Sequence, residues 1–221
     1  MVTEQYNGRA PQTRLIRAGT ELHRISSTSS PYPPNSFNRD GIRELGHPLQ
    51  GRFEPLDTAH GGYLYVALSL AGAVAEGILR DIAIPRSGIL RRKRLADKTY
   101  TVMVLEHDLE VVSLLDGDLR ALNLSGTLVG CGRDGYSWCR STCHAILAAA
   151  PRTDGVIYRC RNNPAEQAVM LLDRNDLDST ALRIVRSRDV LDDPETLDDI
   201  VKVIDEVHHL KYVGDGRAHL P

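Results

Sequence analysis

The longest apolar run of the chain, from Tyr63 to Leu79, most constrains the fold, because a carboxylate interrupts it at Glu76. The run is too short to cross a membrane comfortably. Its first part, YLYVA, is typical of a buried strand. The segment SLAGAVAEGILRDI then predicts a helix with Ser69 as its N-cap. We therefore expect a strand followed by a helix that carries one acidic residue among small apolar ones.

Glu76 is the residue of this run that most needs an explanation. Gly72 and Ala73 lie one helical turn before it and Arg80 lies one turn after it. Small side chains leave room for another molecule to approach the carboxylate. Because an unpartnered carboxylate is costly to bury, Glu76 taken alone is better explained by a solvated flank of the helix than by a pocket.

The composition is that of a globular protein, with 42% hydrophobic and 25% charged residues. A net charge of -2 gives no general attraction to nucleic acid or to an anionic membrane, so we expect neither as a partner. The N-terminus lacks the apolar core of a signal peptide, and the four cysteines are too unevenly spaced for a disulfide framework. We expect reduced thiols and a cytoplasmic location.

Further helices and strands are predicted along the chain. Residues 136–150 form a helix that Pro151 stops, and a second helix begins near Asp193, a cap, with Pro194 in its first turn. The apolar, β-branched segments TYTVMVL, DLEVVSLL, GVIYRC, EQAVMLLD and ALRIVRS predict strands. The fold class that follows is α+β, with a mixed or antiparallel sheet as the core and flanking helices.

The chain shows no repeat and no convincing interdomain linker, so we expect one domain over residues 14–212. Residues 1–13 and 213–221 are polar and are predicted to be loose tails. Residues 26–41 hold serine and proline at a density that predicts a loop, and a loop of this length inside a domain is often functional.

Two further segments are given structural interpretations. The basic segment RSGILRRKRLADK has no interleaved aromatic residues, which favours a solvated face over a nucleic-acid site. Cys139, Cys143 and His144 lack the second ligand pair of a structural zinc site, so buried thiols explain them better and no metal is expected.

Four other residues have ordinary explanations when each is taken alone. Arg24 and Arg52 would be surface ion-pair residues, Tyr65 a core tyrosine with its hydroxyl at the edge, and Cys160 a buried thiol.

The order of several short motifs gives these residues another interpretation. HRI is followed by a proline-rich loop ending in SFN, then by GRF and YVALSLAGAVAE. Later come YSW at a helix start, DGVIYRCRNNP and QAVMLLDR. This order resembles the RES-domain family over roughly residues 14–175. The resemblance implies an ADP-ribosyltransferase-like fold and action on NAD. Many members of that family are toxins of bacterial toxin–antitoxin pairs that split the nicotinamide–ribose bond, with phosphate or water as acceptor.

The resemblance also implies site residues. Arg24 and Arg52 fall at the family's two arginine positions, Tyr65 at its tyrosine and Glu76 at its glutamate. Cys160 stands where the family usually has serine.

The chemistry of NAD is consistent with these positions. Guanidinium groups such as those of Arg24 and Arg52 bind phosphate oxygens in pairs. An aromatic face such as that of Tyr65 can stack on the cationic nicotinamide ring, and Phe53 is a further candidate contact. Cleavage passes through an oxocarbenium-like state, which a fixed carboxylate at Glu76 would stabilise. The catalytic residues that the resemblance implies are Glu76, Arg52, Tyr65 and Cys160.

Several alternatives stay open. A thiol at Cys160 is a weaker donor than a hydroxyl, which would slow the site; it would be reactive if Arg159 or Arg161 depressed its pKa. A weakened or altered site is favoured over one that binds NAD without turnover. The same donor would also serve mono-ADP-ribosylation of a protein or small molecule. The expected macromolecular partner is a cognate antitoxin, for which the loop 26–41 is a candidate lid or contact, and a homo-oligomer is left open.

Overall fold

A computed structural model describes residues 4–39, 44–47, 50–57, 60–80, 87–175 and 177–214. One sheet of eight strands dominates it, in the spatial order β1-β6-β7-β8-β3-β2-β5-β9. Neighbouring strands are antiparallel except β6 and β7, which are parallel. The strands are β1 (Thr13–Ile16), β2 (Glu21–Ser27), β3 (Tyr63–Ala67), β5 (Lys98–Leu105), β6 (Leu109–Leu114), β7 (Gly155–Cys160), β8 (Asn163–Leu172) and β9 (Leu182–Asp189).

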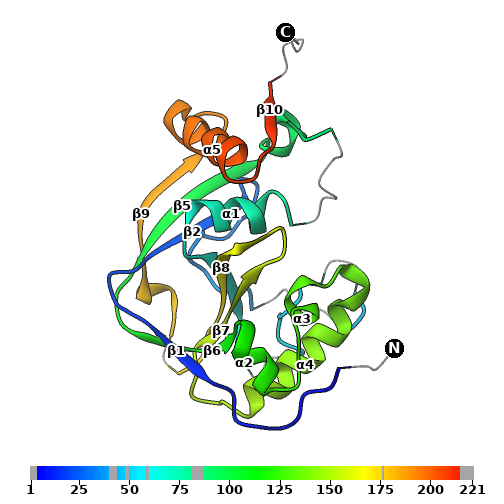
Figure 1. The fold of residues 1–221 in the computed structure, drawn as a ribbon. Coiled ribbons are helices and arrows are strands. Elements are labelled where there is room, and N and C mark those ends of the chain that lie inside the picture. The colour runs from blue at the N-terminus through cyan, green and yellow to red at the C-terminus, as the bar shows by residue number, and fades with distance from the viewer. Residues whose placement is uncertain are drawn as a thin grey trace.

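Helices pack on one side of this sheet, and a short parallel pair of strands completes the fold (Figure 1). The pair is β4 (Ile89–Arg91) with β10 (Lys211–Val213). The helices are α1 (Leu70–Gly77), α2 (Asp116–Ala121), α3 (Thr127–Gly130), α4 (Tyr136–Ala148) and α5 (Pro194–Glu206). The predicted α+β class with a mixed sheet and flanking helices is therefore confirmed.

Local sequence signals explain where the two best-predicted helices begin. Ser69 caps α1, and its hydroxyl accepts a hydrogen bond from the Gly72 N–H at 2.9 Å. Asp193 caps α5 and accepts from the Thr196 N–H at 3.4 Å, with proline in the first turn. The first helix is shorter than predicted. It ends at Gly77, because glycine disfavours helix and the Leu79 N–H turns back to the Val74 carbonyl.

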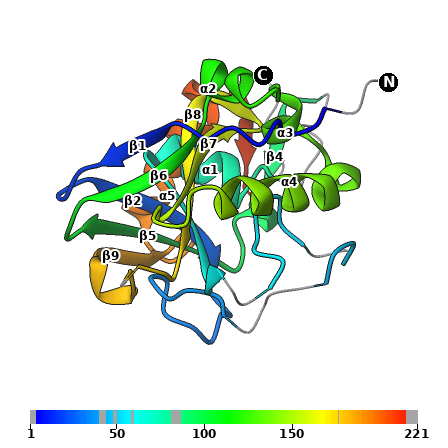
Figure 2. The ribbon, with the colours of Figure 1, turned by 90° about the horizontal axis from the view of Figure 1, so that it is seen from below.

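Each face of the large sheet carries its own hydrophobic core. On β3, Tyr63 faces the core to which α1, α3, α4 and α5 contribute, while Leu64 and Val66 face the other, as strand alternation requires. The second core joins Ile16 at one end of the sheet to Leu182 at the other. The sheet therefore curves around this second core, as Figures 1 and 2 show.

The sheet is split between β2 and β3. The two strands pair only at His23 and Ala67, whereas β3 pairs with β8 over the whole of Tyr63–Ala67 and β2 pairs with β5 along its full length. Beyond that single pair, β2 and β3 diverge and leave room between them. This split is the feature of the fold that positions the candidate site.

The N-terminal segment, which we expected to be loose, lies against the helices in its described part. Glu4 accepts hydrogen bonds from Ser125, and its carbonyl accepts one from the Trp138 ring N–H at 3.3 Å.

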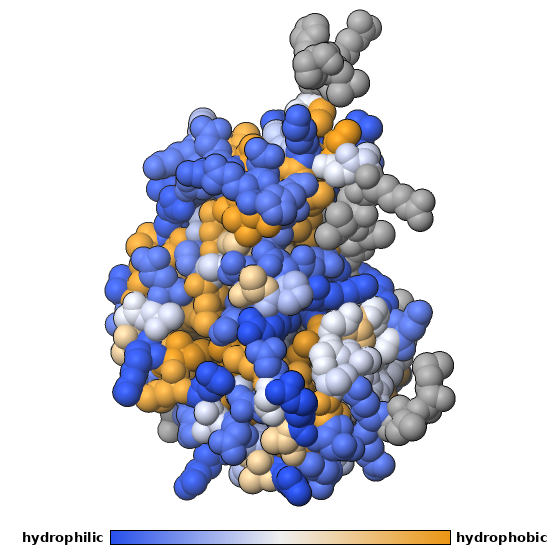
Figure 3. Space-filling view, in the orientation of Figure 1, coloured by the Kyte–Doolittle hydropathy of each residue, from blue (hydrophilic) through white to orange (hydrophobic). Residues whose placement is uncertain are grey.

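Figure 3 shows one face of the molecule, on which hydrophobic residues lie between hydrophilic ones. Among the described residues, no helix is both long enough and apolar enough to span a membrane.

Candidate functional site

A cleft of about 320 Å³ opens where β2 and β3 diverge. Arg24 comes from β2, Tyr65 from β3 and Glu76 from α1, so three of the predicted site residues meet there. Its other lining residues are His23, Ile25, Ser26, Ser27, Val66, Ala67, Ala73, Gly77, Arg80 and Lys98.

Small residues on α1 bring Glu76 to this cleft. A Cβ added at Gly77 would lie 2.7 Å from both the Cβ and the carbonyl oxygen of Ile25 on β2. Real Cβ atoms do not tolerate so short a contact, so a larger residue at 77 would push the helix away from the strand. Glycine at this position therefore sets how closely Glu76 approaches β2.

The Glu76 carboxylate is held by two donors from other parts of the chain. Arg52 Nη2 lies 2.9 Å from Oε1 and 3.2 Å from Oε2, and the Tyr158 hydroxyl donates to Oε2 at 3.2 Å. The Arg52 side chain is 1% exposed and that of Glu76 is 11% exposed. Glu76 is thus a partly covered carboxylate with a fixed orientation, not the solvated residue that its sequence context alone suggested.

The Arg52 guanidinium is held in its ion pair with Glu76 by further contacts. Its other terminal nitrogen donates to the Val129 carbonyl, and its guanidinium lies 5.2 Å from the Tyr158 ring and 5.5 Å from the Phe53 ring. Burial works to lower the pKa of Arg52, but Glu76, Tyr158 and Tyr136 together outweigh it, so the pKa is raised. From its chemistry we expected Arg52 to anchor a phosphate. In the structure it lies beneath the cleft and is engaged by Glu76, so it is not placed to do so.

Tyr65 presents its ring to the cleft while its hydroxyl points inward. The hydroxyl oxygen accepts from the Phe53 N–H at 3.0 Å, and the ring meets that of Tyr63 edge-on at 5.8 Å. Burial raises the pKa of Tyr65, so its hydroxyl stays protonated at neutral pH. The ring is consequently rigid enough to act as a stacking surface.

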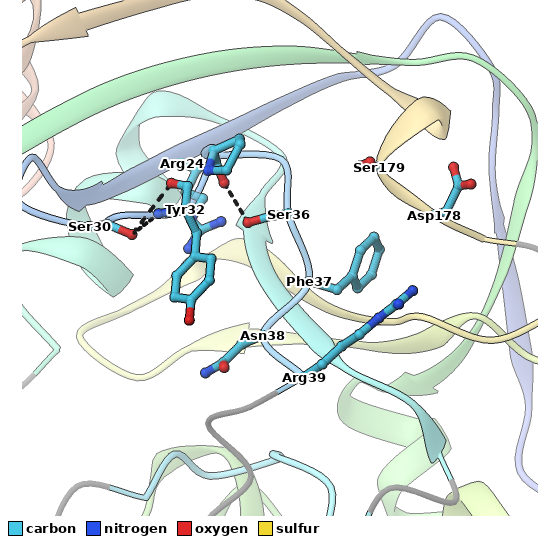
Figure 4. Close-up of a pocket in the computed structure, with 10 residues that line it drawn as sticks. Arg24, Ser30, Tyr32, Ser36, Phe37, Asn38, Arg39, Asp178 and Ser179 are labelled. Carbon is cyan, nitrogen blue, oxygen red and sulfur yellow. Dashed lines mark hydrogen bonds between the residues drawn. The ribbon is translucent and has the colours of Figure 1, made fainter.

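Arg24 lines both the cleft and a second cavity of about 560 Å³. Its Nη1 donates to the Pro34 carbonyl at 2.5 Å, and burial lowers the pKa of Arg24 to about 10, so it stays cationic. The second cavity is bounded by the serine- and proline-rich loop, with the rings of Tyr32 and Phe37 along it and Ser179 on the opposite side (Figure 4). Arg24 is the residue common to the described linings of the two cavities.

Phe53 and Cys160 lie outside the main cleft. The Phe53 ring is 1% exposed and packs on Tyr158 with centroids 4.7 Å apart, so it belongs to the core and not to a ligand surface. Cys160 is also 1% exposed, and its thiol lies 3.9 Å from the Gly72 carbonyl and next to Glu76. Burial and the Glu76 charge raise the pKa of Cys160, which disfavours a reactive thiolate.

Two site residues escaped the sequence analysis. Tyr158 lies in the YRC motif and holds Glu76, but its period-two position on β7 predicts only a core residue. Arg80 lines the cleft, and its guanidinium lies 5.2 Å from the centre of the Tyr65 ring. Its position one helical turn after Glu76, directly after the apolar run, was the signal that could have identified it.

Other potential ligand motifs are not used in this way. Residues 130–135, GCGRDG, have the glycine spacing of a dinucleotide-binding loop, but they lead from α3 toward α4, whereas such a loop leads from a strand to a helix. The four cysteines are free thiols. Within the described ranges, no group of three or more His, Cys, Asp or Glu side chains is placed to hold a metal ion.

Comparison with known proteins gives two similarities. A family model described as the RES domain matches residues 21–193. The crystal structure of the M. tuberculosis MbcT–MbcA toxin–antitoxin complex contains a chain of similar fold, with a TM-score of 0.53 and 18% sequence identity. That match covers 79% of this chain and 86% of the other. No curated protein sequence matches the chain.

Proposed function

The chain belongs to the RES-domain family, and from this premise we propose that it is an NAD-consuming enzyme that splits the nicotinamide–ribose bond. One observation carries the proposal: Glu76 is fixed by Arg52 and Tyr158 at a cleft that an aromatic ring and Arg24 also line. A carboxylate held in this way can stabilise positive charge that develops on a ribose ring.

The proposed reaction breaks the bond between the nicotinamide nitrogen and the anomeric carbon of the ribose. The bonding pair leaves with nicotinamide, which becomes a neutral base, and positive charge spreads over the anomeric carbon and ring oxygen. Glu76 lies close to this charge and stabilises it more than the ground state. Phosphate or water then adds to the anomeric carbon, giving ADP-ribose 1-phosphate or ADP-ribose. When water is the acceptor, it releases one proton to solvent and keeps the other in the new hydroxyl group.

The two cavities that Arg24 lines suggest how NAD would bind. We place the nicotinamide end beside Tyr65 and Glu76 in the smaller cavity. Arg24 would contact the pyrophosphate at the junction, and the adenosine end would extend toward Tyr32 in the larger cavity. Arg52 and Tyr158 would act as positioning residues that set the orientation of Glu76. No step in this scheme requires a metal.

We further propose that the protein is the toxin of a toxin–antitoxin pair, acting in the cytoplasm where NAD is available. Two observations support this: family membership, and the similarity in fold to a chain of a toxin–antitoxin complex. A cognate antitoxin would then cover the cleft, and the loop over residues 26–39 is its candidate contact, since this loop bounds the larger cavity.

The alternative is transfer of ADP-ribose to a protein or small molecule, or binding of NAD without turnover. Cys160 in place of serine keeps these alternatives open, because its thiol lies beside Glu76. Incubation with NAD labelled in the adenosine part separates them. Label on a macromolecule indicates transfer, and a thermal shift with NAD but no free nicotinamide indicates binding alone.

The deciding experiment is to incubate the purified protein with NAD, with and without phosphate, and to identify products by mass. We expect free nicotinamide together with ADP-ribose or its 1-phosphate. Glu76→Gln should lower the rate by at least about 100-fold, because it removes a charge that acts in the transition state. Glu206→Gln, at the exposed end of α5, is the matched control and should leave the rate unchanged. Cleavage at the parent rate by Glu76→Gln would refute the assignment.

A further inference from the structure

Arg80 lines the cleft beside Glu76, yet its contacts do not use its N–H groups. Its guanidinium lies 5.2 Å from the centre of the Tyr65 ring and 5.8 Å from that of Tyr136, so it is held by stacking between aromatic residues. Its Nε is buried without a hydrogen-bond partner. In the part of the chain that the structure describes, Arg80 makes no ion pair and meets no hydrogen-bond acceptor.

The other two guanidinium groups at this site are already engaged. Arg52 is hydrogen-bonded to Glu76 and to a backbone carbonyl, and Arg24 donates to the Pro34 carbonyl. Arg80 differs because the faces of the Tyr65 and Tyr136 rings hold its guanidinium in position. This leaves the N–H donors in the guanidinium plane available to a ligand. A buried donor without an acceptor costs free energy unless a ligand or water supplies one.

We infer that Arg80 is the phosphoryl-binding residue of the cleft, its guanidinium hydrogen-bonding the oxygens of inorganic phosphate or of the pyrophosphate of NAD. The inference rests on the proposed function for the identity of the substrate. The binding chemistry it claims, a guanidinium with a phosphate oxyanion, can be tested without turnover.

The surroundings of Arg80 suit an anion. Burial works to lower the pKa of Arg80, but Tyr65, Glu76, Tyr158 and Tyr136 together outweigh it and raise the pKa, so Arg80 is cationic at any physiological pH. Three cationic side chains line the cavity, those of Arg24, Arg80 and Lys98, against the single carboxylate of Glu76, which is itself paired with Arg52. Arginine binds phosphate through paired donors, which a rigidly stacked guanidinium presents with little loss of freedom.

A glycine keeps the space around this side chain open. A Cβ at Gly51 would lie 3.0 Å from Arg80 Nη2 and 2.5 Å from Glu54 Oε1. Glu54 forms no ion pair with Arg80, although both approach Gly51. The space at Gly51 therefore admits both the Arg80 guanidinium and the Glu54 carboxylate without an ion pair between them.

The first test is binding, measured by calorimetry in phosphate-free buffer with two probes, inorganic phosphate and ADP. The variants are Arg80→Gln, which removes the charge, and Arg80→Lys, which keeps the charge but loses the paired donors. Arg94→Gln is the control, because Arg94 is exposed and lies outside the cleft. We expect Arg80→Gln to weaken at least one probe roughly 10- to 100-fold, Arg80→Lys to weaken it less, and the control to match the parent protein.

The second test distinguishes the source of the phosphoryl group. If Arg80 binds the acceptor, Arg80→Gln raises KM for phosphate and leaves KM for NAD in phosphate-free buffer unchanged. If it binds the pyrophosphate, KM for NAD rises in phosphate-free buffer. A role in stability alone would lower the amount of active enzyme without changing either KM.

Three results would overturn the inference. They are binding of both probes by Arg80→Gln as tight as by the parent protein, no binding of either probe by the parent at millimolar concentration, and unchanged KM values for both substrates. Should Arg80→Gln fail to fold, Arg80→Lys decides by the same criteria. A parent protein that binds the probes but releases no nicotinamide would overturn the proposed function and leave the role of Arg80 standing.

Discussion

Two ion pairs of this protein have almost the same length and very different surroundings. Arg52 and Glu76 approach to 2.9 Å with side chains 1% and 11% exposed, whereas Arg17 and Asp108 approach to 2.8 Å with side chains 73% and 42% exposed. Distance therefore does not distinguish them. The first pair lies beneath the cleft between β2 and β3, and the second joins the segment after β1 to the turn before β6.

Burial gives the two pairs different roles. Water screens the exposed pair and can replace either partner, so it contributes little to stability. In the buried pair, losing one partner leaves an uncompensated charge in the protein interior. The buried pair is also hydrogen-bonded to Tyr158 and the Val129 carbonyl, which fixes the carboxylate. Restricting Glu76 to one orientation is what would make it useful in catalysis.

The largest effect is expected when the buried pair is broken on its arginine side. Arg52→Met should lower the free energy of unfolding by about 3–5 kcal/mol, because Glu76 loses its counter-ion where water cannot replace it. The thermal midpoint should fall by on the order of 10 °C. Differential scanning calorimetry measures the change. A fall no larger than that for an exposed arginine would remove the distinction between the two pairs.

A smaller effect is expected from the second donor to Glu76. Tyr158→Phe keeps the ring that packs on Phe53 and removes the hydroxyl that donates to the carboxylate at 3.2 Å. We expect nicotinamide release to slow by roughly 10-fold, the effect of about one hydrogen bond to a charged group. Tyr212→Phe is a control, because that hydroxyl is buried without a partner and lies elsewhere. An unchanged rate would show that Arg52 alone positions Glu76.

A still smaller effect is expected at Cys160. Because burial and Glu76 raise the pKa of Cys160, we expect the thiol to stay protonated at neutral pH and not to act as a nucleophile. Cys160→Ser should therefore retain NAD turnover within a few-fold of the parent, or raise it, since a hydroxyl is the better donor. Rate measurements and iodoacetamide labelling with mass analysis test this. Loss of turnover in Cys160→Ser, or rapid alkylation of Cys160, would indicate thiol chemistry.

The smallest effect is expected at the exposed pair. Arg17→Met makes the same substitution as the buried variant but at a site where water takes over the interaction. The thermal midpoint should shift by less than about 2 °C, and nicotinamide release should be unchanged. A shift comparable to that of Arg52→Met would show that charge and not burial governs both sites.

Much of the fold could be predicted from the sequence, because its signals are local. The apolar run YLYVA predicted β3 with the bounds that the structure gives, and the Ser69 and Asp193 caps marked the starts of α1 and α5. The end of α1 was harder, because Gly77 both stops the helix and allows close contact with Ile25.

The site was less predictable, because its properties depend on contacts between distant segments. The resemblance to the RES-domain family pointed to Arg24, Tyr65 and Glu76, which meet at one cleft. Sequence patterns could not show that Arg52 is buried, since its exposure is set by α3 and β7, which follow it in the chain by more than seventy residues. The split between β2 and β3 was likewise hidden, because both strands have ordinary strand composition.

The central claim is that Glu76, held by Arg52 and Tyr158, faces the nicotinamide–ribose bond that is broken. The most direct measurement is a crystal structure of the Glu76→Gln variant, slowed in turnover, with NAD bound. We predict the nicotinamide ring beside Tyr65, the anomeric carbon facing the side chain at position 76, and phosphate oxygens against Arg80 or Arg24. NAD bound elsewhere, or with its nicotinamide–ribose bond turned away from position 76, would contradict the account.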